Sequence, residues 1–129
     1  MSGTMSDLYA DLQRAGSEVM KREIEAVVKR GAMNIKRDWR ENAKATSGTH
    51  ARAYPYSVTF DGPDREGPNT ITAEIGPDKG KPQGALGNLL EYGDGKTRNP
   101  PHNDGKLAAE KEQDKFANAI LKTAAGYLL

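Results

Sequence analysis

The 129-residue sequence contains no cysteine, few aromatic residues and almost no net charge. The missing cysteines exclude disulfides and cysteine-ligated zinc sites. A net charge of +1 lacks the strongly basic footprint of a dedicated nucleic-acid-binding domain. No apolar run approaches the roughly 20 residues that span a membrane, and residues 1–7 do not resemble a secretory signal. We therefore expect a protein that is made in the cytoplasm and has no membrane partner.

The length predicts a single domain over residues 1–129. Apolar residues make up 36% of the chain, which is low for a domain that folds alone. Either much of the chain is extended and solvated, or part of its stability comes from partner subunits, since association favours the folded state by mass action. The second case fits a subunit of an oligomer.

Two helical segments are predicted at the ends of the chain. Residues 6–45 carry apolar side chains mostly three or four positions apart, which is the pattern of one helical stripe. Gly16 is a candidate break in this segment. Gly31 weakens the helix by about 1 kcal/mol relative to alanine, and close approach of another backbone would explain it. Residues 106–129 predict a closing helix with Asp104 as its N-terminal cap.

The middle of the chain, residues 46–105, is rich in glycine and proline. Residues 54–61 and 70–76 alternate apolar and polar side chains, and the turn-forming residues 62–69 join them, which predicts an antiparallel hairpin. Residues 85–92 predict one or two helical turns. The expected fold class is α+β, with the long N-terminal helix and the C-terminal helix packed on a small antiparallel sheet made of the hairpin and loops.

No residue pattern indicates catalysis or a cofactor. The segment 93–97 ends like a phosphate-binding loop, but Leu90 stands where that pattern needs its first glycine. His50 and His102 are the only histidines and lie far apart, so a metal site is not indicated. Ser47 lies near His50, which leaves a small hydrolase as a minor alternative, but a triad needs a third, orienting group. We expect no enzyme, no metal and no cofactor.

The second half of the first helix is basic. Six cations oppose only Asp38 and Glu41, a net charge of +4: Lys29, Arg30, Lys36, Arg37, Arg40 and Lys44. Such a stretch is ordinary at a solvated helix end, where cations complement the helix dipole. It would also suit contact with phosphates. A small nucleic-acid-binding accessory protein that uses these residues is therefore the alternative function.

Several short motifs occur in a fixed order along the chain. They are Asn42-Ala43 followed by Ser47-Gly48, then Ile75-Gly76-Pro77, then Leu90-Glu91-Tyr92-Gly93, then Pro100-Pro101 ahead of the last helix. This order resembles the neck and tail-component family of siphophages. Three departures occur, since Lys44 replaces a proline of the family pattern, Ser47-Gly48 stands for its Thr-Gly step and His102-Asn103 replaces its Phe-Leu step.

The resemblance implies a structural protein of a long-tailed bacteriophage virion, synthesised in the host cytoplasm and placed at the neck or in the tail. Its partners would be copies of itself in a ring, expected to be a hexamer, other head-tail junction or tail proteins, and DNA that passes through the lumen. The apolar and aromatic residues predicted to lie between subunits are Trp39, Tyr54, Tyr56, Leu86, Leu89, Leu90 and Tyr92. For Trp39, core packing against the hairpin is the other interpretation.

Overall fold

The computed structural model describes residues 5–67, 70–93 and 101–128; the side chains of residues 6–16, 50 and 128 are not part of that description. The principal elements are α1 (Met5–Thr46), β1 (Val58–Arg65), β2 (Ile71–Pro77) and α4 (Asp104–Leu128). Short helical turns connect them: η1 (Thr49–Ala51), α2 (Tyr54–Ser57), η2 (Gly84–Leu86) and α3 (Gly87–Tyr92). The predicted α+β class is confirmed.

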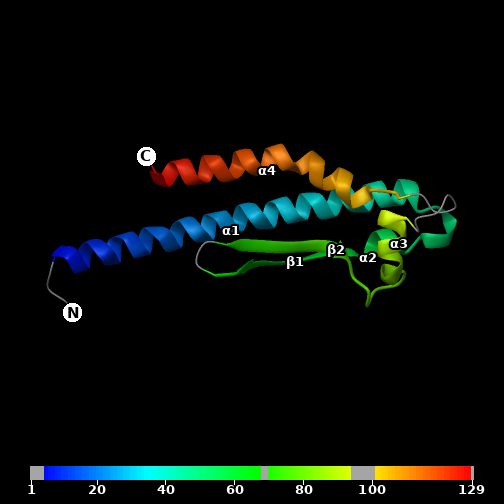
Figure 1. Cartoon of the computed structure of the whole chain (residues 1–129), viewed down its shortest axis with the longest axis horizontal. Coiled ribbons are helices and arrows are strands. Elements are labelled where there is room, and N and C mark those ends of the chain that lie inside the picture. Colours follow the sequence, from blue (N-terminus) through cyan, green and yellow to red (C-terminus); the bar gives the residue numbers. More distant parts are fainter. Residues whose placement is uncertain (1–4, 68–69, 94–100, 129) are drawn as a thin grey trace.

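The long helix α1 lies between the hairpin and α4 (Figure 1). Its 42 residues span about 63 Å at 1.5 Å per residue. The hairpin lies along one side of α1, and α4 runs antiparallel along another side, so α4 packs chiefly on α1 and only its middle part approaches the sheet. The predicted break at Gly16 is wrong, because α1 continues through it. One glycine costs about 1 kcal/mol, which is too little to interrupt a helix of this length.

Small residues bring α1 and α4 close together. A Cβ atom on Gly105, in the first turn of α4, would lie 2.7 Å from the Trp39 ring of α1. A Cβ atom on Gly31 would lie 2.9 Å from the ring of Phe116 on α4. The predicted reason for Gly31 was close approach of another backbone, and this is wrong, because the neighbour is a side chain. Gly31 therefore provides the space that the Phe116 ring needs to pack on α1.

The first strand begins later than the sequence predicted. Tyr54–Ser57 form one helical turn with Pro55 in its first positions, where the fixed φ of proline suits a helix. The Ser57 hydroxyl donates a hydrogen bond of 2.6 Å to the Tyr54 carbonyl and closes this turn. The alternating pattern over residues 54–61 therefore predicted a strand correctly only from Val58 onward.

The first strand also ends later than predicted, because Gly62-Pro63 does not form the turn of the hairpin. The register shifts between Asp61 and Asp64, so Gly62 and Pro63 lie in a bulge within β1. Gly62 has a φ of 101°, which glycine adopts readily and other residues rarely do. Beyond the bulge, Asp64 pairs with Thr72 and Arg65 with Ile71.

Two ion pairs attach the far end of the hairpin to α1. The Arg65 guanidinium donates from Nε to Glu25 and from Nη1 to Glu18, the second at 3.0 Å. These contacts lower the pKa of Glu18, first through the hydrogen bond from Arg65 and then through its positive charge. The same carboxylates raise the pKa of Arg65.

We expect this contact to depend on pH. Because the pKa of Glu18 is lowered in the folded state, the contact stabilises the fold above the ordinary glutamate value of 4.5 and is lost as the pH falls through the lowered pKa. A carboxyl-carbon NMR titration should therefore place Glu18 below 4.5, and Arg65→Gln should return it to the ordinary range. An unchanged Glu18 titration in Arg65→Gln would contradict this account.

Candidate functional site

The seven predicted interface residues fall into an inner and an outer group. Tyr54 has no exposed surface and forms a core cluster with Ala43 and Ala51. Trp39 and Leu90 are partly buried and pack against this cluster. Tyr54 therefore cannot offer its side chain to a partner in this structure, which corrects its predicted place at an interface. For Trp39, the structure supports core packing.

The outer group contains three residues spaced three apart on η2 and α3, which we call the α3 patch: Leu86, Leu89 and Tyr92. Their side chains are 38%, 40% and 71% exposed, respectively. Tyr56 is 58% exposed but lies elsewhere, with the Lys44 ammonium 5.4 Å from its ring centre. The structure thus leaves four of the seven predicted residues accessible to a partner.

Glu91, which lies between Leu90 and Tyr92 in one of the family-like motifs, has a structural role that the sequence did not indicate. Its side chain is buried, and its oxygens accept hydrogen bonds of 3.0 and 3.1 Å from the Gly105 amide and 3.1 Å from the Lys106 amide. These amides lie in the first turn of α4, whose dipole favours a negative charge. Glu91 therefore caps α4 from a different element.

Asp104 is not the N-terminal cap that the sequence predicted, because it is the first residue of α4 itself. Its buried carboxylate accepts a 2.7 Å hydrogen bond from the Thr46 hydroxyl at the end of α1. The Asn42 side-chain amide also donates to the Asp104 carbonyl, at 3.0 Å. Asp104 therefore joins the start of α4 to the end of α1.

The six cations of α1 share one helical face, which we call the basic face: Lys29, Arg30, Lys36, Arg37, Arg40 and Lys44. At 100° per residue they occupy about a third of the helix circumference. Two of them contact carboxylates, Arg37 at 3.4 Å from Asp38 and Lys44 at 3.1 Å from Glu41.

Within the described residues, the remaining cations of the basic face are not paired with carboxylates. Lys36 lies 5.5 Å from the ring centre of Phe60, and Arg40 Nε donates 2.8 Å to the Val58 carbonyl. Lys29 and Arg30 are exposed, and neither forms an ion pair within the described part of the chain. The face therefore keeps a positive charge that α1 and the hairpin do not neutralise.

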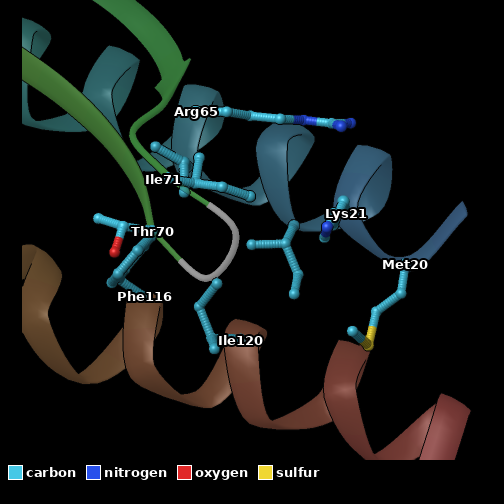
Figure 2. Close-up of a pocket in the computed structure, with 10 residues that line it drawn as sticks. Met20, Lys21, Arg65, Thr70, Ile71, Phe116 and Ile120 are labelled. Atoms are coloured by element: carbon cyan, nitrogen blue, oxygen red, sulfur yellow. The ribbon is translucent and has the colours of Figure 1, made fainter. Parts of the chain in front are cut away.

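A cavity of about 350 Å³ opens between α1, α4 and the far end of the hairpin. In Figure 2, Phe116 and Ile120 of α4 and Ile71 of β2 line it, with Met20 and Lys21 of α1 at its side. Its lining is mostly apolar, and its two cations already have carboxylate partners, Glu18 for Lys21 and both Glu18 and Glu25 for Arg65. It lacks the convergent polar groups that orient a substrate.

The chemistry considered from the sequence is not assembled in the described residues. Among them, no three His, Asp or Glu side chains gather to hold a metal ion. The segment 94–97 and the side chain of His50 lie outside what the structure describes. His102 Nδ1 lies 3.7 Å from the buried Asp104 carboxylate. No helix in the described ranges is long and apolar enough to cross a membrane.

Comparison of the chain with protein-family models, with curated proteins and with solved structures gave no match. Two surfaces distinguish the described part of the chain: the exposed apolar side chains on α3 and the basic face on α1.

Proposed function

We propose that this protein is a structural subunit of a long-tailed bacteriophage particle, which forms a ring at the neck or the head-proximal end of the tail by protein–protein docking. One observation carries the assembly role. Within the described residues, ten large apolar side chains are exposed, whereas only seven apolar residues are buried and four of those are alanines. Partner subunits that cover such side chains add the burial that the small core does not supply.

The order of the family-like motifs supports the phage assignment. The Gly76-Pro77 step ends β2, and Gly87 at the start of α3 packs closely on the Pro77 ring. Glu91 then caps α4. The Ile75-Gly76-Pro77 and Leu90-Glu91-Tyr92-Gly93 motifs therefore meet at α3, which carries the α3 patch. No step of this role requires catalysis or a cofactor.

A nucleic-acid-binding accessory protein is the second candidate, because Lys29 and Arg30 on the basic face are exposed and unpaired in the described part of the chain. Retention on duplex DNA across a salt series tests it. Phosphate contacts must appear first at low salt, so a chain that is not retained there lacks this function.

The ring proposal is tested by sedimentation velocity of the purified protein and by probing purified virions for it. We expect a concentration-dependent closed oligomer, which negative-stain images should resolve as a ring, and the presence of the chain in the particle. A protein that stays monomeric and is absent from virions would overturn the proposal. The identity of the neighbouring genes provides an independent check.

The α3 patch makes a specific prediction for assembly. Leu89→Asp places a charge in a surface that docking would dehydrate, so we expect self-association to weaken at least about tenfold. Asn88→Asp is the matched control, since it adds the same charge at an exposed neighbouring position without removing an apolar side chain. Equal sedimentation of both variants and the wild type would remove α3 from the interface.

A further inference from the structure

The hairpin has an acidic face that points away from α1. Phe60, which lies beneath Lys36, and Arg65, which binds α1, mark the side of β1 that faces the helix. Successive strand residues alternate between faces, so Asp61 and Glu74 point outward, and so does Asp64 beyond the bulge. With two flanking residues these carboxylates form what we call the acidic face: Asp61, Asp64, Glu66, Glu74 and Asp78, all of them exposed.

The acidic face brings carboxylates close to one another. Asp61 and Glu74 are directly opposite each other in the strand register, an arrangement in which like charges destabilise a sheet. Together with Asp78 they line one shallow hollow. Within the described residues, none of the five carboxylates forms an ion pair. A cation supplied by another molecule would relieve this repulsion.

The basic face has complementary properties. A second shallow hollow lies over it, and its four cations outnumber its one carboxylate; it is lined by Met33, Asn34, Lys36, Arg37, Arg40, Glu41, Lys44 and Tyr56. Met33 and Tyr56 are 48% and 58% exposed, so the surface offers apolar contact as well as charge. Residues 29–44 extend about 22 Å along α1. The strand segment 58–66 extends about 26 Å, so the two faces have similar lengths.

We propose that the basic face of one copy docks on the acidic face of the next copy. This inference rests on the proposed ring and names the surfaces that join its subunits. The sheet itself separates the acidic face from α1, so one copy cannot neutralise its own charges. The two faces are different surfaces that point in different directions, so the contact is heterologous. Repeated contacts of this kind close into a ring when the rotation between subunits permits.

Nucleic acid is the rival occupant of the basic face. It would use the cations, but it would leave the carboxylates Asp61 and Glu74 opposed and uncompensated. A second copy supplies partners for both faces at once, and this is why we assign the basic face to a neighbouring subunit. The two occupants predict different results for charge reversal.

The experiment uses two charge-reversed forms of the full chain. One carries Lys29→Glu and Arg30→Glu on the basic face, and the other carries Asp61→Lys and Glu74→Lys on the acidic face. Each double substitution lowers the magnitude of the charge on its face by four, so the six cations of the basic face fall from +6 to +2 and the five carboxylates of the acidic face from −5 to −1. We therefore expect self-association of each form at low salt to weaken at least about tenfold. In an equimolar mixture, the reversed residues of one form can pair with the reversed residues of the other, and the assembly should return.

The matched control reverses two exposed cations of α4, with Lys106→Glu and Lys122→Glu, and should assemble like the wild type. Thermal unfolding by circular dichroism checks that each variant folds, and recovery in the mixture confirms it independently.

Reversed forms that assemble alone like the wild type would overturn this docking, whereas Leu89→Asp would still test the ring. Loss of DNA retention in the basic-face form, without recovery of assembly on mixing, would assign that face to nucleic acid and overturn the inference. A monomeric wild type absent from virions would overturn the proposed function itself.

Discussion

Replacing Tyr54 by alanine should lower the free energy of unfolding by about 3–5 kcal/mol, the usual cost of removing a large aromatic side chain from a core. Tyr54 has no exposed surface and is the largest fully buried side chain among those that the structure describes. It lies among Ala43, Ala51, Trp39 and Leu90, and the alanines are too small to fill the space that it would leave. A domain of this size has only about 5–15 kcal/mol of stability, so the variant should be close to unfolding.

The measurement is urea unfolding followed by circular dichroism, carried out at a concentration below any self-association. Tyr56→Ala is a control with the same chemical change two residues away. Because Tyr56 is 58% exposed, its loss should change the free energy of unfolding by no more than about 0.5 kcal/mol. Similar losses in the two variants would mean that the core does not form around Tyr54.

Replacing Glu91 by alanine should lower the free energy of unfolding by about 3 kcal/mol. The change removes the acceptor for the Gly105 and Lys106 amides, and a buried donor without a partner costs about 1–3 kcal/mol. It also removes a negative charge from the positive end of the α4 dipole. Glu91→Gln keeps one oxygen acceptor and should lose less stability than Glu91→Ala.

Hydrogen exchange provides a local measurement of the same effect. In Glu91→Ala the amides of Gly105 and Lys106 should exchange faster relative to those in the middle of α4, because the first turn opens more often. Glu110→Ala, at an exposed position of the same helix, is the control and should leave both rates unchanged. If Glu91→Ala behaves like Glu110→Ala in stability and exchange, Glu91 is not the cap of α4.

The sequence by itself determined the elements whose side chains repeat with a clear period. The stripe of apolar residues predicted the ends of α1 and α4 to within two residues, and the alternating pattern predicted the ends of β2 to within one residue. The apolar spacing over residues 85–92 gave the helical turns of η2 and α3. Each of these follows from local geometry, because a helix or strand that buries one face must repeat at its own period. The six cations of the basic face share a side of α1 for the same reason.

Tertiary structure decided the features that depend on residues far apart in the chain. Pro55 suits an edge strand and a helix start equally well, and packing alone placed Tyr54 inside and Tyr56 outside. The Gly62-Pro63 step suits a turn or a bulge, and pairing with β2 made it a bulge. Glu91 caps a helix that begins 13 positions later, which no local pattern indicates. The acidic face likewise required the strand register, because only pairing brings Asp61 opposite Glu74.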